Sequence, residues 1–178
     1  MNTDFHFLEA KKLLVDLIRI PSISKDEKSA ADFLEKHMAM KGIESGRFGN
    51  NIWSLSPAFN LKKPTLLLNS HIDTVKPVSG WTIDPFTPLE KNSKLYGLGS
   101  NDAGASLVTL FEVFQLLIKK EQHYNLIYLA SCEEEISGEN GISAALSQLP
   151  PIDFALVGEP TLMQPAIAEK GLMVLDVI

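Results

Sequence analysis

One short stretch of this 178-residue chain brings together residue types that bind metal ions. The apolar run Leu66–Leu68 has the pattern of a buried parallel strand, and His71 and Asp73 follow it. Alternate side chains of an extended segment point the same way, so we expect the Asp73 carboxylate beside the His71 imidazole. A carboxylate placed there fixes the tautomer of a metal-binding histidine. We interpret His71 as a metal ligand oriented by Asp73, with a solvated His–Asp pair as the open alternative.

A second carboxylate, Asp102, stands at the start of a long apolar segment, 103–118, which we predict to be a largely buried helix. A short strand over 94–98 precedes it. An N-cap is one interpretation of Asp102, because aspartate is common at that position. A ligand is the other, because Gly97 and Gly99 allow the backbone to approach a bound group closely.

Carboxylates also follow two further predicted strands. Three consecutive glutamates, Glu133–Glu135, follow the buried strand over 126–130, and Glu159 follows the strand over 154–157. Neighbouring carboxylates repel one another, so the three glutamates either spread into water or are gathered by a cation. Adjacent side chains of an extended segment face opposite ways, so Glu134 and Glu135 are expected to take different roles.

Strands and helices alternate along the chain, which predicts an α/β fold: a three-layer sandwich with a mostly parallel central sheet and helices on both faces. The carboxyl ends of parallel strands share one edge, where we expect the histidine and carboxylates to meet. The remaining predicted elements are a helix over 5–20, a helix from the capping box Ser24–Glu27 to the C-cap Gly42, strands over 43–48 and 52–55, the central strand over 65–69, a loop over 75–89, a helix over 138–149 and a strand over 167–178.

The composition limits the class of protein. Hydrophobic residues make up 45% of the chain and charged residues 21%, as in an ordinary globular domain. The net charge of -6, without a basic cluster, argues against a nucleic-acid partner. No apolar run approaches the roughly 20 residues that span a bilayer, and the N-terminus lacks a signal-peptide pattern. A single cysteine suits a reducing compartment. We therefore expect a cytoplasmic protein with no membrane partner.

One histidine with several carboxylates is a ligand set for zinc, with Co²⁺ or Mn²⁺ as alternatives. The segments that carry these residues also resemble, in order, the signatures of one family, the dinuclear zinc deacylases and exopeptidases that include acetylornithine deacetylase, succinyl-diaminopimelate desuccinylase and glutamate carboxypeptidase. The resemblance extends from the N-terminal helices to the last residue. The matching segments are Ser70–Val75, Gly97–Gly104, Cys132–Gly141 and Gly158–Thr161.

The resemblance implies a role for each metal ligand. His71 and Glu159 would hold one Zn²⁺ ion, Glu135 would hold the second, and Asp102 would bridge both. The family also implies a cis peptide bond between the bridging aspartate and the next residue, here Ala103.

The family's general base directly precedes its metal-binding glutamate. Counting back from Gly138 and Gly141, which resemble glycines of the family motif, makes Glu134 the base and Glu135 the ligand. Glu133 then replaces the acidic residue that usually precedes them. By this resemblance two zinc ions activate a water and polarise the scissile carbonyl, and Glu134 carries the proton from the water to the leaving amine.

The chain departs from the family pattern at two places, and we expect it to be a fragment. Leu98 replaces a common arginine, and Ala103–Ala105 replaces a Lys-Gly pair, but neither departure changes a proposed ligand. The family's fifth ligand is a C-terminal histidine, but no histidine follows His123. We expect residues 1–168 to be the N-terminal part of a catalytic domain and 169–178 the start of a lid and dimerisation domain. Such a fragment would bind metal and substrate poorly, and the full-length protein would be a homodimer.

The motifs are nearest to those of acetylornithine deacetylase. We therefore expect hydrolysis of a small N-acyl amino acid, N-acetylornithine or N-succinylornithine, in arginine biosynthesis. The alternatives are a desuccinylase or dipeptidase of the same family, or a non-catalytic scaffold on the same fold. Retention of the whole set of ligand and base residues argues against the scaffold.

Overall fold

The computed structural model describes residues 3–168, so the last predicted strand, over 167–178, lies almost wholly outside the described residues, as does the predicted start of a lid at 169–178. The helices and strands are α1 (Thr3–Ile18), α2 (Lys28–Met40), β1 (Gly46–Phe48), β2 (Asn51–Leu55), β3 (Thr65–His71), β4 (Leu89–Lys91), β5 (Lys94–Tyr96), α3 (Ala105–Leu117), β6 (Asn125–Ser131), α4 (Ile142–Leu146) and β7 (Phe154–Val157).

A five-stranded mixed sheet in the order β1-β2-β6-β3-β7 forms the centre of the molecule. β6, β3 and β7 run parallel, and β2 runs antiparallel to both of its neighbours. β3 and β6 are almost wholly buried, which agrees with the apolar runs Leu66–Leu68 and Leu126–Ala130 within them. The predicted α/β class is confirmed, and the sheet is mixed, with two parallel and two antiparallel pairings.

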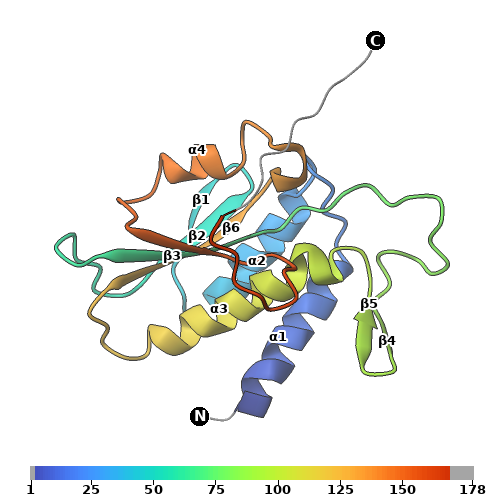
Figure 1. Ribbon diagram of the computed structural model, residues 1–178, viewed down its shortest axis with the longest axis horizontal. Helices are drawn as coiled ribbons and strands as arrows, with labels where there is room; N and C mark the ends of the chain where they lie inside the picture. The colour runs from blue at the N-terminus through green and yellow to red at the C-terminus, as the bar shows by residue number, and fades with distance from the viewer. Residues whose placement is uncertain (1–2, 169–178) are drawn as a thin grey trace.

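Helices cover the sheet unequally. α1, α2 and α3 lie on one face, and the short helix α4 lies on the other (Figure 1). On the thicker face, Phe111 of α3 is fully buried between His37 of α2 and Tyr128 of β6, with ring centroids 5.9 and 5.1 Å away. On the thinner face, Ala145 of α4 packs with Leu67, Ile127 and Leu129. Both faces of β3 and β6 are thus removed from water, which stabilises the edge that carries the site.

The capping box predicted at Ser24–Glu27 is wrong. The Ser24 hydroxyl donates to the Asp73 carboxylate at 2.7 Å, and the Glu27 carboxylate accepts from Lys25 and more distant groups instead of closing the box. Tertiary hydrogen bonds have replaced the local ones. The C-cap at Gly42 is confirmed, since its φ is +70° and its N–H donates to a carbonyl in the last turn of α2.

The helix predicted over 138–149 is much shorter in the structure, because α4 spans only Ile142–Leu146. Residues before it wrap around Glu133, whose carbonyl accepts from Gly138 N and whose carboxylate accepts from Asn140 N. A Cβ at Gly141 would lie 2.7 Å from the Cys132 carbonyl oxygen, so this segment packs too tightly to coil.

The strand predicted over 94–98 is present but does not belong to the central sheet. It forms β5, which pairs with β4 as a separate two-stranded hairpin that projects from the main sheet (Figure 1). Asn92 and Ser93, both with positive φ, make the two-residue turn of this hairpin. Asp102 therefore does not follow a strand of the central sheet.

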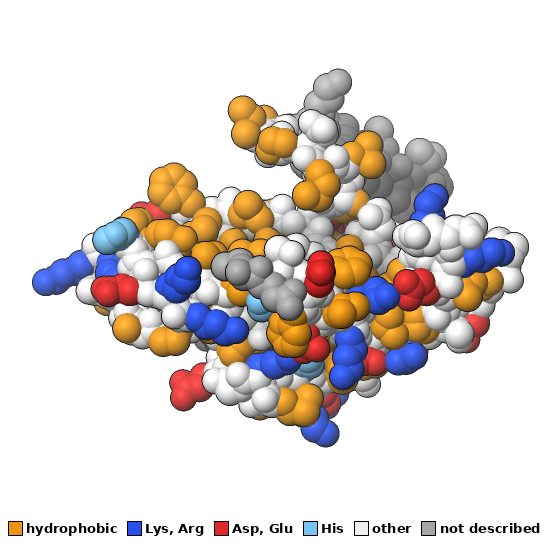
Figure 2. All heavy atoms as spheres, turned by 90° about the horizontal axis from the view of Figure 1, so that it is seen from below, with side chains coloured by type: hydrophobic (Ala, Val, Ile, Leu, Met, Phe, Trp, Pro, Cys, Tyr) orange, Lys and Arg blue, Asp and Glu red, His pale blue; other side chains and the backbone are white. Residues whose placement is uncertain are grey.

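Among residues 3–168, no helix is long and apolar enough to cross a membrane. On the face shown in Figure 2, lysine and arginine side chains are interspersed with acidic ones and do not form a single basic patch.

Replacement of Phe111 by alanine should lower the free energy of unfolding by about 3–5 kcal/mol, the usual cost of removing a buried phenylalanine ring. Urea unfolding followed by circular dichroism would measure the change. Phe7→Ala in α1 is the matched control, because the Phe7 side chain is 65% exposed and its loss should change stability by about 0.5 kcal/mol or less. Equal effects of the two substitutions would contradict this description of the core.

Candidate metal centre

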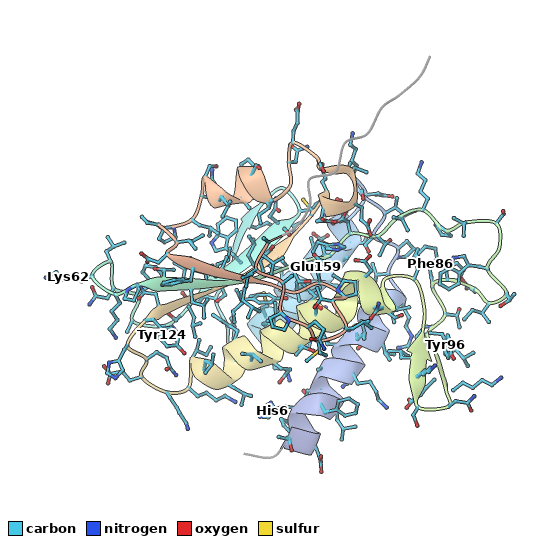
Figure 3. The ribbon with its side chains drawn as sticks, viewed as in Figure 1. His6, Lys62, Phe86, Tyr96, Tyr124 and Glu159 are labelled. Carbon is cyan, nitrogen blue, oxygen red and sulfur yellow. The ribbon has the colours of Figure 1, made fainter. Side chains whose placement is uncertain are left out.

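The register of the parallel strands places the predicted site residues at one edge. His71 pairs with Ser131 of β6, so the three glutamates that follow β6 begin just beyond the level of His71. Asn69 pairs with Val157 of β7, so Glu159, two residues further on, lies level with His71. Figure 3 shows Glu159 near the middle of the molecule, whereas Lys62 and Tyr124 lie at the opposite end of the sheet.

The His71 ring is held with one nitrogen facing the carboxylates. Its Nδ1 lies 2.9 Å from the Asp73 carbonyl oxygen and 3.4 Å from Asp73 Oδ1. Both are acceptors, so the proton of a neutral ring stays on Nδ1 and leaves the Nε2 lone pair free. Nε2 lies 3.2 Å from Asp102 Oδ1 and 3.8 Å from an oxygen of each of Glu134 and Glu159. The ring is therefore oriented as a metal ligand would be.

Asp102 reaches the site from an irregular helical turn, Ser100–Gly104, that leads into α3. Gly99 has a φ of +72°, and a Cβ there would lie 2.6 Å from the Thr74 methyl group, so this position requires glycine. Asp102 makes no side-chain cap to the helix, and the peptide bond that follows it is cis, as the resemblance implied. Its side chain is 56% exposed and contacts His71, which disfavours the N-cap interpretation.

The glutamates after β6 form a tight turn and are not extended. Glu133 has a φ of +54°, and Glu134–Ile136 make a single 3₁₀ turn. The backbone N–H groups of Glu134 and Glu135 donate to the two oxygens of Asp73, at 3.1 and 3.2 Å. The expectation that an extended backbone would send Glu134 and Glu135 to opposite sides is wrong, because the turn presents both side chains to the site.

Glu159 is positioned by the chain just before it. Gly158 N–H donates to the Asn69 carbonyl oxygen at 2.8 Å, and the Ser70 hydroxyl donates to the Gly158 carbonyl oxygen at 2.8 Å. A Cβ at Gly158 would lie 2.8 Å from that of Ser106 in α3. A glycine thus lets β7 deliver Glu159 directly over the end of β3.

Burial and neighbouring charges shift the pKa values of the site. Burial raises the pKa of Glu159 to about 7; the charge of His71 opposes this shift, and the charges of Glu134, Asp102 and Glu135 add to it. Burial and then Asp102 also raise the pKa of Glu135. Burial lowers the pKa of His71, but the hydrogen bond and charge of Asp73 raise it to about 9 overall. The site holds more negative charge than its single imidazolium balances.

The donor set fits a divalent metal ion. Ligand atoms of His71, Asp102 and Glu135 all lie within 4.8 Å of one another, and Glu134 and Glu159 approach the same nitrogen of His71. One imidazole with several carboxylates suits zinc, manganese or cobalt. A cation placed among these groups would also relieve their repulsion.

The structure thus brings all six predicted site residues together: His71, Asp73, Asp102, Glu134, Glu135 and Glu159. Ser24 and Glu27 were predicted only as a local capping box, whereas Ser24 hydrogen-bonds Asp73 and Glu27 hydrogen-bonds Glu133 in the structure. Neither residue has a signal in the sequence that points to the site, because both reach it through contacts between distant segments.

The protein is thus an α/β protein in which an imidazole and several carboxylates that can bind a metal ion meet at one edge of the sheet. The sequence matches the model of Peptidase family M20/M25/M40 over residues 67–170. The chain belongs to this family, and the expected resemblance is confirmed.

Curated relatives are similar over part of their length. The chain is 39% identical to acetylornithine deacetylase of Proteus mirabilis (strain HI4320) over 107 residues, which is 60% of this chain and 28% of that protein. It is 32% identical to succinyl-diaminopimelate desuccinylase of Variovorax paradoxus (strain S110) over 171 residues, or 86% of this chain and 44% of that protein. The chain therefore spans less than half the length of these relatives.

Solved structures share the fold. An M20 family metallo-carboxypeptidase, Sso-CP2 of Sulfolobus solfataricus, superposes with a TM-score of 0.69 at 24% identity, covering 84% of this chain and 37% of that one. The YXEP protein of Bacillus subtilis, described as a dinuclear metal-binding peptidase, superposes with a TM-score of 0.64 at 18% identity, covering 88% of this chain and 43% of that one.

Metal binding should release protons, because a ligand histidine must be neutral and the His71 pKa of about 9 keeps the free ring protonated at neutral pH. Zinc affinity should rise about tenfold per pH unit between pH 7 and 8, because His71 releases one proton when the metal binds. It should rise more steeply below pH 7, where metal binding also displaces a proton from Glu159. Calorimetry in buffers of different ionisation enthalpy would count the protons.

His123→Gln is the control for this measurement, because His123 lies at the opposite end of the sheet, just before β6. It should keep the same proton release, whereas His71→Ala should lose the tenfold dependence between pH 7 and 8 together with most of the affinity. An affinity of the unaltered chain that does not change with pH would contradict the assignment of His71.

Proposed function

We propose that this chain forms part of a metal-dependent amide hydrolase that removes the acyl group from an N-acylated amino acid. The observation that carries the proposal is the convergence of His71, Asp102 and Glu135 within 4.8 Å of one another. Membership of the Peptidase M20/M25/M40 family supports the same reaction class.

The roles that we propose follow the geometry and the family resemblance. His71 and Glu159 would hold one ion, Glu135 would hold a second, and Asp102 would bridge them, with Zn²⁺ as the favoured metal. Bound ions of this kind lower the pKa of a water and polarise the scissile carbonyl.

Glu134 is the proposed general base. Its side chain is half exposed and lies 3.8 Å from His71 Nε2, so it can face both a bound water and a substrate. It would accept a proton from the attacking water and pass it to the leaving amine. Asp73 would keep the His71 ring in place throughout, since it is fully buried and hydrogen-bonded on all sides by neighbouring groups.

For the substrate we favour N-acetylornithine, followed by N-succinylornithine, which would place the protein in arginine biosynthesis. Similarity to acetylornithine deacetylase of Proteus mirabilis supports this choice. The second candidate is succinyl-diaminopimelate, because the chain is also similar to a desuccinylase over 86% of its length.

The arrangement of the whole protein is also part of the proposal. Residues 1–168 would be the N-terminal part of the catalytic domain, and 169–178 would begin a lid domain through which two subunits associate. The single cysteine, Cys132, is buried and unpaired, which suits a cytoplasmic location.

Glu134→Gln in the full-length protein should leave metal content unchanged and reduce kcat about 10²–10⁴-fold, because the amide cannot accept the proton. Hydrolysis of N-acetylornithine and elemental analysis of the same samples would measure both effects. Glu139→Gln is the matched control, since Glu139 is exposed in the same loop and should keep full activity. Near-normal turnover by the Glu134→Gln variant would disprove the role of Glu134.

A panel of N-acetyl, N-succinyl and dipeptide substrates would separate the proposed activities. We expect kcat/KM to be highest for N-acetylornithine. A preference for succinyl-diaminopimelate would establish the second candidate. A purified full-length protein with neither bound metal nor activity on any member of the panel would instead indicate a non-catalytic scaffold.

A further inference from the structure

Glu27 is a buried carboxylate whose position no local structure explains. It directly precedes α2, and its exposed fraction is 0%. It makes no side-chain cap to its own helix. A carboxylate removed from water is strongly destabilising unless hydrogen-bond donors replace the lost solvation. The groups that supply those hydrogen bonds indicate what the residue does.

The donors to Glu27 come from three separate segments. Its Oε1 accepts from Lys25 N–H at 2.7 Å and from Glu133 N–H at 3.2 Å, and its Oε2 accepts from Asn50 Nδ2 at 2.9 Å. These partners are two backbone amides and a side-chain amide, and none of them is a cation. Glu27 is therefore tied to the backbone of the turn that carries Glu134 and Glu135.

The first three backbone N–H groups of that turn donate to buried carboxylates. Glu27 accepts the N–H of Glu133, and Asp73 accepts the next two N–H groups, those of Glu134 and Glu135. Three consecutive backbone N–H groups thus donate to two carboxylates from distant segments. Glu133 has a positive φ, which a non-glycine residue adopts at a cost, so its backbone needs such support.

The Glu133 side chain supports the turn from the other side. Its carboxylate is nearly buried and accepts from Asn140 N at 3.2 Å and from Asn140 Nδ2 at 3.0 Å. A Cβ at Gly138 would overlap the Glu133 side chain, so the loop closes tightly around this carboxylate. The turn is thereby fixed at both ends, by Glu27 at its first amide and by Asn140 beyond its last residue.

We propose that Glu27 is a positioning residue for the metal centre: through the N–H of Glu133 it sets the direction in which Glu134 and Glu135 leave the turn. The importance of this role for catalysis rests on the proposed function. The hydrogen bonds themselves do not, so the two ideas can be tested separately. A change of direction at Glu133 would move both glutamate side chains together, whereas loss of a ligand would affect only one.

Amide hydrogen exchange of the unaltered chain, followed residue by residue by NMR, tests the contacts without any metal. The amides of Glu133, Glu134 and Glu135 should exchange slowly although they lie outside the strands. The amide of Glu139 is the internal reference, because no hydrogen bond among residues 3–168 uses it, and it should exchange at least tenfold faster. Rapid exchange at Glu133 in the folded chain would overturn the proposal.

Variants then connect the contact to the metal centre. Glu27→Ala should speed exchange at Glu133–Glu135 and weaken zinc or cobalt binding about 10- to 100-fold, the range for loss of a group that supports metal ligands. Glu27→Gln keeps an oxygen acceptor for the Glu133 N–H and should restore most of both properties. Glu35→Ala is the matched control, since Glu35 lies on α2, the helix that Glu27 directly precedes, and pairs with Arg47 at the surface.

The outcomes separate a local effect from a global one. If Glu27→Ala speeds exchange equally through β3 and β6, the residue only stabilises the fold and the proposal is wrong. If Glu27→Ala and Glu35→Ala bind metal with equal affinity, the proposal is also wrong. A third outcome is that neither the unaltered chain nor its full-length form takes up metal, while the Glu133 amide exchanges slowly in the unaltered chain and rapidly in Glu27→Ala. In that case the proposed function fails but the positioning contact stands.

Discussion

Repulsion between carboxylates is the constraint on which this structure depends. Asp102, Glu134, Glu135 and Glu159 lie around one imidazole, and the pKa values of Glu135 and Glu159 are raised first by partial burial and then by the neighbouring carboxylates. Solvent alone would favour spreading these groups apart. The fold must therefore hold them in place through their backbones, which is what its sheet edge and tight turns do.

The backbone is held by hydrogen bonds to further carboxylates, which is an unusual solution at an already acidic site. Asp73 and Glu27 are buried, and they accept the N–H groups of the turn that carries the glutamates. Each additional negative charge adds to the repulsion. The advantage of a carboxylate as the acceptor is a strong and directional hydrogen bond, because a hydrogen bond to a charged acceptor is about twice as strong as a neutral one. A bound cation would favour the whole arrangement.

Hydrophobic patterns in the sequence were sufficient to predict the large elements. The runs Leu66–Leu68 of β3 and Leu126–Ala130 of β6 are apolar because both faces of these strands are covered, and the helices predicted over 5–20 and 103–118 correspond to α1 and α3. Two shorter elements were mispredicted although their partners lie nearby in the sequence. The segment over 138–141 failed to coil because it closes around Glu133, and β5 pairs only with β4. Neither contact leaves a hydrophobic pattern in the sequence, so the pattern did not predict it.

The sequence by itself determined which residue types follow the strands of the central sheet, and hence that His71, Glu134, Glu135 and Glu159 form one acidic edge. Asp102 joins that edge from the turn before α3 and not from a strand of the sheet. A parallel sheet gathers its strand ends whatever the details of packing, so order along the chain sufficed. Only the tertiary structure decided how that edge is supported. The links from Ser24 to Asp73 and from Glu27 to Glu133 span 49 and 106 residues, and hydrogen bonds over such separations depend on the packed arrangement of α2 against the sheet.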